Sequence, residues 1–131
     1  MKLDVFPVVL VVDDDRGQVA LGTSFLKRAG FRVISANSAI QALAALEVAG
    51  DAIQGISLLV TDLDMPGMSG RTFAAQMVAK HPNLKVLYVT GNADELFRQG
   101  SMLAVHEAFL EKPVSSEALR EAVDLLLRPR T

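Results

Sequence analysis

Acidic, hydroxyl and ammonium side chains follow short apolar runs at four points of this sequence. An aspartate triplet at residues 13–15 ends the first run, and Asp62 ends a later one. Thr90 and Lys112 stand in the same relation to two further runs. Carboxylates are ligands for hard cations, whereas a hydroxyl donor and a lysine ammonium suit phosphate oxygens. If the fold brings these positions together, they can bind a divalent cation and a phosphoryl group side by side.

The acids Asp13, Asp14 and Asp62 cannot lie close together without compensation of their charge. At about 5 Å and an effective dielectric constant near 20, two carboxylates repel each other by roughly 3 kcal/mol. Either a proton is taken up or a cation binds. A site with few protein carboxylates and some retained water suits Mg²⁺, or Mn²⁺ in its place. We therefore expect a magnesium site if these acids converge.

The elements that must position these residues alternate regularly between short apolar runs and longer amphipathic segments. The apolar runs predict strands at residues 8–12, 31–35, 56–61, 84–89 and 107–110. The amphipathic segments predict five helices. Two are placed by their ranges, at residues 16–29 and 94–103, and one runs from a Ser38/Gln41 capping box to about residue 50. The other two are placed by their apolar faces, one with Phe73 and Met77 and one with Leu119, Ala122, Val123 and Leu126.

Five repeats of strand then helix predict an α/β fold, with a doubly wound parallel sheet covered by helices on both faces. In open sheets of this kind, sites form beyond the carboxyl ends of the strands, where the strand order reverses. A strand order of 2-1-3-4-5 would place the first and third strands side by side. The acids after these strands would then converge, with Thr90 and Lys112 on one flank.

Size and composition fit one globular domain at residues 1–131, with a core at about residues 7–127. Half of the residues are apolar, 21% are charged and none is cysteine, while the net charge is −2. The absence of a basic stripe argues against direct binding to nucleic acid. No stretch approaches the roughly 20 apolar residues that span a bilayer, and no signal peptide is present. We therefore expect a soluble cytoplasmic protein without membrane contact.

Each motif taken alone also has an ordinary structural explanation. An acidic triplet after a strand is usually a solvated turn or a helix cap, and Asp15 is a candidate cap. A Thr-Gly or Lys-Pro pair after a strand is more often only part of a loop. The joint occurrence of these motifs at four strand ends is what favours a site for phosphate and metal.

Four stretches, in the order in which they occur along the chain, resemble the response-regulator receiver family of two-component signalling. They are VLVVDDD at residues 9–15, LVTDLDMPGMSG at 59–70, VLYVTG at 86–91 and FLEKPV at 109–114. The resemblance covers nearly the whole chain and implies a flavodoxin-like fold with strand order 2-1-3-4-5. It also implies a domain that takes a phosphoryl group from a histidine kinase or a histidine phosphotransfer protein. Such a domain is no enzyme beyond its own aspartyl phosphorylation and dephosphorylation.

The resemblance assigns roles to the acidic residues of the expected site. Asp62 would accept the phosphoryl group as an acyl phosphate. Together with Asp62, Asp13 and Asp14 would hold Mg²⁺, directly or through water, and the backbone carbonyl of Asp64 would add a further ligand. The Asp64 and Asn92 side chains would tune the rate at which the phosphate is hydrolysed.

The resemblance also implies how the site changes conformation. Thr90 and Lys112 would each bind a phosphate oxygen, and Thr90 would move inward on phosphorylation. Phe109 would be the switch aromatic that turns inward with it. The peptide bond between Lys112 and Pro113 would be cis. Because Phe109 has no hydroxyl, an output that needs a tyrosine hydrogen bond at this position is not implied.

Three other functions are compatible with parts of the sequence. Residues 58–64 resemble the D-x-D motif of haloacid dehalogenase-like phosphatases, but Pro66 departs from that motif and the predicted strand is the third instead of the first. A second alternative is a receiver fold that only binds partners and is never phosphorylated. A third is a flavin-binding protein, although acids at the switch point would repel the phosphate of the flavin.

The output of the protein is not specified by these residues. The sequence contains no output domain, so it describes either a stand-alone regulator or the receiver of a larger protein such as a hybrid kinase. The initial Met1 favours the stand-alone regulator. We expect a monomer or a dimer that forms on phosphorylation.

Overall fold

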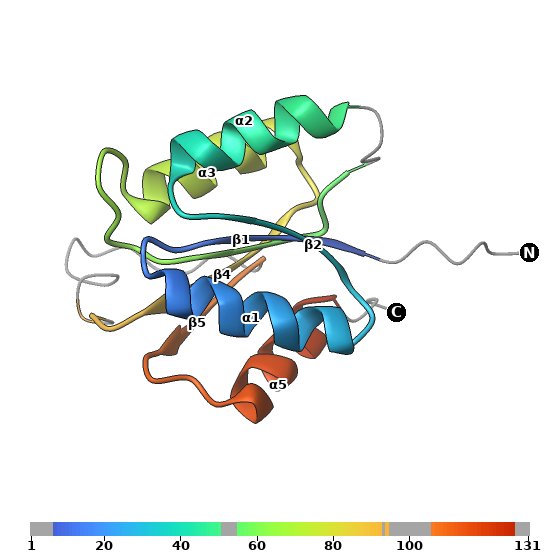
Figure 1. Ribbon diagram of the computed structural model, residues 1–131, viewed down its shortest axis with the longest axis vertical. Helices are drawn as coiled ribbons and strands as arrows, with labels where there is room; N and C mark the ends of the chain where they lie inside the picture. Colours follow the sequence, from blue (N-terminus) through green and yellow to red (C-terminus); the bar gives the residue numbers. More distant parts are fainter. Residues whose placement is uncertain (1–6, 51–54, 93, 95–105, 128–131) are drawn as a thin grey trace, which may run out of the picture.

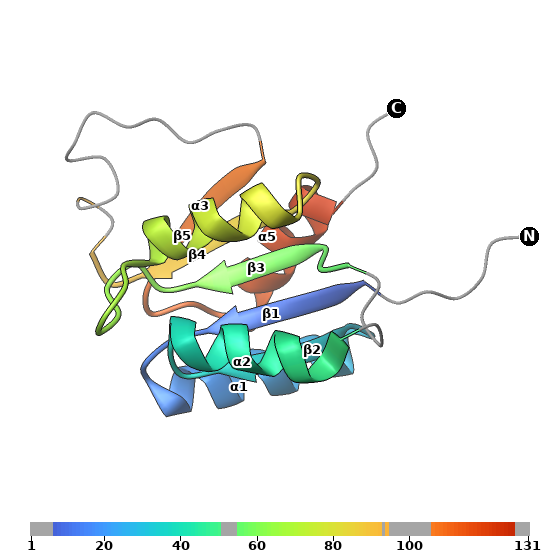
Figure 2. The ribbon, with the colours of Figure 1, turned by 90° about the horizontal axis from the view of Figure 1, so that it is seen from above.

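A computed structural model of the chain describes residues 7–50, 55–92, 94 and 106–127. Five strands form one parallel sheet in the order β2-β1-β3-β4-β5, which confirms the predicted topology (Figure 2). The strands are β1 (Val8–Val12), β2 (Arg32–Ala36), β3 (Leu58–Thr61), β4 (Lys85–Thr90) and β5 (Glu107–Glu111).

Four helices cover the two faces of this sheet, as a doubly wound fold requires. Figure 1 shows α2 and α3 on one face and α1 and α5 on the other. The helices are α1 (Arg16–Arg28), α2 (Ala39–Ala49), α3 (Gly70–Lys80) and α5 (Ser116–Leu127). The predicted helix at residues 94–103 lies outside the described residues, apart from Asp94. None of the helices in the described part of the chain is long and apolar enough to cross a membrane.

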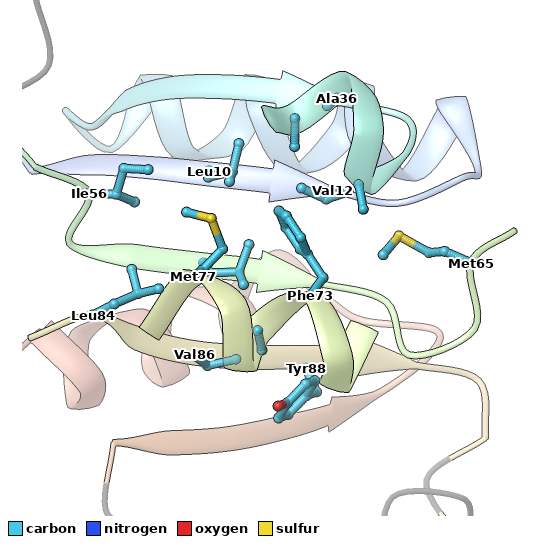
Figure 3. Close-up of a cluster of buried hydrophobic side chains, with 14 of the residues drawn as sticks. Leu10, Val12, Ala36, Ile56, Met65, Phe73, Met77, Leu84, Val86 and Tyr88 are labelled. Carbon is cyan, nitrogen blue, oxygen red and sulfur yellow. The ribbon is translucent and has the colours of Figure 1, made fainter. Parts of the chain in front are cut away.

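The sheet is buried on both faces because its central strands carry apolar side chains on both sides. Every residue of β1 and β3 is buried, which explains why both strands are continuous runs without polar alternation. Figure 3 shows the cluster beneath α2 and α3, where Phe73 and Met77 pack onto the sheet. A second cluster under α1 and α5 contains Leu26, Leu119 and Val123. These clusters confirm the faces predicted for the third and last helices.

Local signals in the sequence explain where the first helix begins and ends. Asp15 caps α1, because its side chain accepts a hydrogen bond from the backbone N–H of Gln18. Gly30 follows the helix with φ 100°, a conformation that favours glycine. Both features agree with the prediction for this helix.

The capping box predicted before the second helix is only half formed. Ser38 accepts a hydrogen bond from the Gln41 N–H at 3.1 Å, as expected. The Gln41 side chain, however, accepts from the N–H of Asn37 at 2.9 Å and not from that of Ser38. The glutamine therefore stabilises the loop one residue earlier than the capping box requires.

Strand boundaries differ from the prediction by one or two residues. β3 begins at Leu58 and not at residue 56, because its parallel pairing with β1 starts at the Val9–Leu58 pair. β4 extends to Thr90, which pairs with Glu111 of β5. Thr90 is therefore the last residue of a strand and not the first residue of a loop.

Candidate functional site

The pairing of β1 with β3 brings the first aspartates together with Asp62. Val12 and Thr61 are neighbours in the register of the two strands, so the next residues along each chain leave the sheet at the same edge. The Asp62 N–H continues the ladder by donating to the Val12 carbonyl at 3.1 Å. Parallel pairing, and not closeness in sequence, therefore sets Asp13 beside Asp62.

Three carboxylates converge at this edge. One oxygen from each of Asp13, Asp14 and Asp62 lies within 4.8 Å of the others. Asp13 and Asp62 are 5% and 8% exposed, whereas Asp14 is exposed to solvent. A set of hard oxygen donors with one solvent-facing member fits Mg²⁺, which keeps several waters when bound to protein. The predicted convergence of these acids is confirmed.

Lys112 compensates part of this negative charge. Its ammonium lies 2.8 Å from Asp13 Oδ2 and 3.3 Å from Asp62 Oδ2. The backbone N–H of Lys112 also donates to the Thr90 carbonyl at 2.8 Å, so β4 fixes the residue from which the side chain extends. The peptide bond from Lys112 to Pro113 is cis, as predicted. This ammonium is a third source of compensation, beside the proton and the metal ion expected from the sequence.

Burial and neighbouring charges shift the pKa values of both Asp62 and Lys112. Burial raises the pKa of Asp62, and the charge of Asp13 raises it further, while Lys112 and the Leu63 N–H only partly oppose the shift. Burial lowers the pKa of Lys112, but the hydrogen bond and charge of Asp13 and then of Asp62 raise it above the usual value overall. The surroundings therefore favour the charged ammonium of Lys112 and disfavour the ionised carboxylate of Asp62.

Contacts from the surrounding backbone orient the Asp62 carboxylate. The N–H of Leu63 donates to Asp62 Oδ1 at 2.7 Å, which leaves Oδ2 facing Lys112. The Thr61 hydroxyl donates to the Asp62 carbonyl at 2.9 Å. Gly70, the first residue of α3, donates to the Leu63 carbonyl at 2.7 Å. Asp62 is thus held by β3 on one side and by the start of α3 on the other.

Thr90 and Asn92 lie at the end of β4, on the flank of the carboxylates. Thr90 is buried, and its hydroxyl oxygen accepts a hydrogen bond from the Asn92 N–H at 3.0 Å. The Asn92 side chain is exposed, as is that of Asp64 in the loop after β3. Phe109 is half-buried against the cluster of Figure 3. The roles predicted for these four residues stay predictions.

A groove connects the carboxylates with the surface between α1 and α5. Its volume is about 600 Å³, and it reaches from Asp13 and Asp62 past Phe25 of α1 to Leu119 and Arg120 of α5. The groove approaches Asp62 from the opposite side of the sheet to α3.

Two contributors to the site were missed by the sequence argument. Gly70 was given no role, but it begins α3 and its backbone lies against that of Asp62, where a Cβ atom would meet the Asp62 carbonyl group. Asp15 was considered only as a cap, yet its N–H also donates to Asp13 Oδ1 at 2.9 Å and orients that carboxylate. A glycine at the start of a helix that follows a D-x-D motif is a signal that could have identified the first.

A family model for the response regulator receiver domain matches residues 9–124. The chain belongs to this receiver family. Within the family it is 31% identical over 120 residues to the sensor kinase CckA of Brucella abortus (strain 2308), a match covering 92% of this receiver and 12% of the kinase. It is 32% identical over 123 residues to a cyclic di-GMP phosphodiesterase of Thermotoga maritima, covering 94% of this receiver and 31% of that protein.

Solved receiver structures have the same fold. The chemotaxis protein CheY4 of Vibrio cholerae matches with a TM-score of 0.76 and 25% sequence identity, over 94% of this receiver and 100% of that chain. The resemblance stated from the four sequence motifs is therefore confirmed, and the haloacid dehalogenase-like phosphatase and flavin-binding alternatives are not supported. The chain spans less than a third of the length of the kinase and of the phosphodiesterase.

Proposed function

We propose that this receiver domain accepts a phosphoryl group on Asp62 from the phosphohistidine of a histidine kinase or a histidine phosphotransfer protein. The observation that carries the proposal is the convergence of Asp13, Asp14 and Asp62 within 4.8 Å, with the Lys112 ammonium bonded to two of them. Transfer of a phosphoryl group needs positioning and neutralisation of charge more than covalent chemistry by the protein. This site supplies both.

Each residue of the site has a distinct part in the transfer. Asp62 Oδ2 forms the new bond to phosphorus while the bond from phosphorus to the donor imidazole nitrogen breaks. Leu63 holds the other carboxylate oxygen through its N–H at 2.7 Å, so Oδ2 is the free nucleophile once Lys112 turns toward the phosphoryl oxygens. The hydroxyl of Thr90 donates to another of these oxygens.

Asp13 and Asp14 would hold Mg²⁺ together with Asp62 and the carbonyl of Asp64. When bound, the ion neutralises charge on the phosphoryl oxygens. Asp13 is already oriented for this role, because the Asp15 N–H holds one of its oxygens. The exposed Asp14 leaves room for the water that Mg²⁺ retains.

The donor histidine would reach Asp62 from the solvent side of the site, and the groove between α1 and α5 provides contact surface beside it. Movement of Thr90 and Phe109 would then carry the signal to a downstream protein in the cytoplasm, by a shift between two conformations. Asp64 and Asn92, both exposed, would influence access of water to the acyl phosphate. A receiver fold that only binds partners would not need the complete set of acids and lysine found here.

The test is the intact mass of the protein after incubation with acetyl phosphate, with and without Mg²⁺. We expect one added phosphoryl group on the wild type in the presence of Mg²⁺, and none on Asp62→Asn. Asp15→Asn is the matched control, because it makes the same Asp-to-Asn change, keeps the backbone N–H that orients Asp13, and places a residue that also caps helices. A wild type that takes no phosphoryl group and binds no beryllofluoride would contradict the proposal.

A further inference from the structure

Tyr88 links three elements next to the proposed switch. It lies on β4, is 1% exposed, and its hydroxyl donates to Glu107 Oε2 of β5 at 3.1 Å. The guanidinium of Arg71, in the first turn of α3, lies 5.9 Å from the centre of the Tyr88 ring, within the range of a cation–π contact. In Figure 3 the Tyr88 ring lies at the β5 side of the core cluster.

The sheet register places Tyr88 between the two predicted switch residues. It precedes Thr90 by two residues on β4, so both side chains leave the same face of the sheet. On β5 its neighbour in the register is Phe109, whose side chain packs against the same cluster. A change in the position of Phe109 therefore has to be accommodated by the Tyr88 ring.

Arg71 connects this network to the phosphoacceptor by a second path. It follows Gly70, whose backbone lies so close to the Asp62 carbonyl group that no Cβ would fit between them. Gly70 also donates to the Leu63 carbonyl at 2.7 Å. A shift of the chain around Asp62 would therefore displace the start of α3 and with it Arg71, whose guanidinium lies over the Tyr88 ring.

The hydroxyl of Tyr88 has a hydrogen-bond partner, whereas one guanidinium nitrogen of Arg71 has none in the described part of the chain. Burial and the neighbouring Glu107 raise the pKa of Tyr88 well above its usual value, so its hydroxyl stays protonated and donates. Nη1 of Arg71 is buried, and within the described part of the chain it makes no hydrogen bond. Within the described part of the chain, the contact with the Tyr88 ring is therefore the interaction that holds this guanidinium, with no hydrogen bond from Nη1 to assist it.

We infer that Tyr88 is a positioning residue, held by Glu107 and Arg71, that stabilises the conformation of the receiver in which Asp62 is unmodified and bonded to Lys112. Loss of the Tyr88–Glu107 bond would favour the conformation that Thr90 and Phe109 adopt on phosphorylation. The inference rests on the proposed function, since it concerns regulation of the same site. A ligand shifts such an equilibrium only by its difference in affinity for the two states, so ligand affinity is the quantity to measure.

Tyr88 is itself the reporter for the first experiment. The chain contains one tyrosine and no tryptophan, so its emission and its near-ultraviolet dichroism at the tyrosine band report the surroundings of Tyr88 without a label. The probe is beryllofluoride with Mg²⁺, a stable mimic of the phosphoryl group on Asp62. We expect the tyrosine signal of the wild type to change as the probe binds, and no change in Asp62→Asn.

The second experiment measures beryllofluoride affinity by calorimetry in Tyr88→Phe, which keeps the ring and removes only the hydroxyl. Loss of a hydrogen bond to a charged partner corresponds to roughly tenfold in an equilibrium constant. We expect the variant to bind the probe about tenfold more tightly than the wild type. Tyr88→Phe in a Glu107→Ala background should produce no further gain, because the bond is already absent.

Controls separate positioning from mere loss of stability. Leu87→Ala removes a buried side chain from the opposite face of the same strand and lowers stability without touching Tyr88. It should leave the affinity for beryllofluoride unchanged, whereas Tyr88→Phe should not. Unfolding in urea is measured for both, so that a change in affinity can be compared with a change in stability.

The outcomes distinguish failure of the inference from failure of the proposed function. If the wild type binds the probe but Tyr88→Phe has unchanged or weaker affinity, the inference is wrong and the proposed function stands. An unchanged tyrosine signal on binding overturns the inference in the same way. If the wild type neither binds beryllofluoride nor takes a phosphoryl group, the proposed function fails and the inference fails with it.

Discussion

Replacing Gly70 by alanine tests whether the start of α3 positions the phosphoacceptor. A Cβ atom built at Gly70 overlaps the Asp62 carbonyl oxygen and lies 2.9 Å from the Asp62 carbonyl carbon and 3.0 Å from Leu63 Cα. All three atoms belong to the backbone, so no side chain can rotate away to relieve the overlap. Either α3 or the Asp62 backbone must move.

The expected magnitude follows from this geometry. Overpacking in a well-packed interior costs about 1–3 kcal/mol, and contacts with rigid backbone belong at the upper end. We therefore expect Gly70→Ala to lower the free energy of unfolding by about 3 kcal/mol. A displacement of about 1 Å at the reacting group can cost on the order of 100-fold in rate. Phosphorylation of Asp62 by acetyl phosphate should slow by a factor of this order.

Gly22→Ala is a matched control, which should raise the free energy of unfolding where Gly70→Ala lowers it. Gly22 lies in the interior of α1. The nearest atom outside the helix, Val11 Cγ1, would be 3.8 Å from a new Cβ atom, which is an ordinary van der Waals contact. Alanine is favoured over glycine inside a helix by about 1 kcal/mol, so this variant should be more stable than the wild type. Urea unfolding of the three proteins measures both effects. A Gly70→Ala protein within 1 kcal/mol of the wild type, with normal phosphorylation, would refute the argument that this contact positions Asp62.

Two further predictions concern the charges of the site. Because the pKa of Asp62 is raised on folding, the folded state loses stability as pH rises from the unfolded pKa through the folded one. Asp62→Asn should therefore increase the free energy of unfolding near neutral pH but not below the pKa that Asp62 has in the unfolded chain. Urea unfolding at these two pH values measures the difference. An equal increase at both pH values would contradict the assignment to the raised pKa of Asp62. Exchanging the exposed side chains of Asp64 and Asn92 should change the lifetime of the phosphoryl group, followed by intact mass over time, while phosphorylation itself persists. An unchanged lifetime would mean that neither side chain faces the attacking water.

The sequence by itself determined the order and type of the elements that the structure describes. A continuous apolar run of strand length, such as β1, is typical of a strand buried on both faces, and helices between such runs favour a parallel sheet. It also placed the acids, Thr90 and Lys112 at strand ends, because a polar residue after such a run marks the point where the chain leaves the core. The receiver motifs then assigned roles to these residues, and those roles await experiment.

The start of β3 and the partner of the Gln41 side chain could not be predicted, because the first depends on pairing with a neighbouring strand and the second on the backbone path of a loop. β3 begins where its pairing with β1 begins, at the Val9–Leu58 pair, and not where its apolar run starts. Gln41 bonds to Asn37 because the loop before α2 brings that N–H within 2.9 Å. Local propensity contains no information on either distance.

The electrostatics of the site were decided only by the tertiary structure. The distance of 2.8 Å between Lys112 and Asp13 joins residues 99 positions apart, and β3 and β4 separate their strands in the sheet order. The close approach of Gly70 to Asp62 and the bond between Tyr88 and Glu107 likewise depend on packing between elements. A sequence specifies which side chains are available to a site, but the distances that set pKa values and contacts arise only when strands and helices pack in three dimensions.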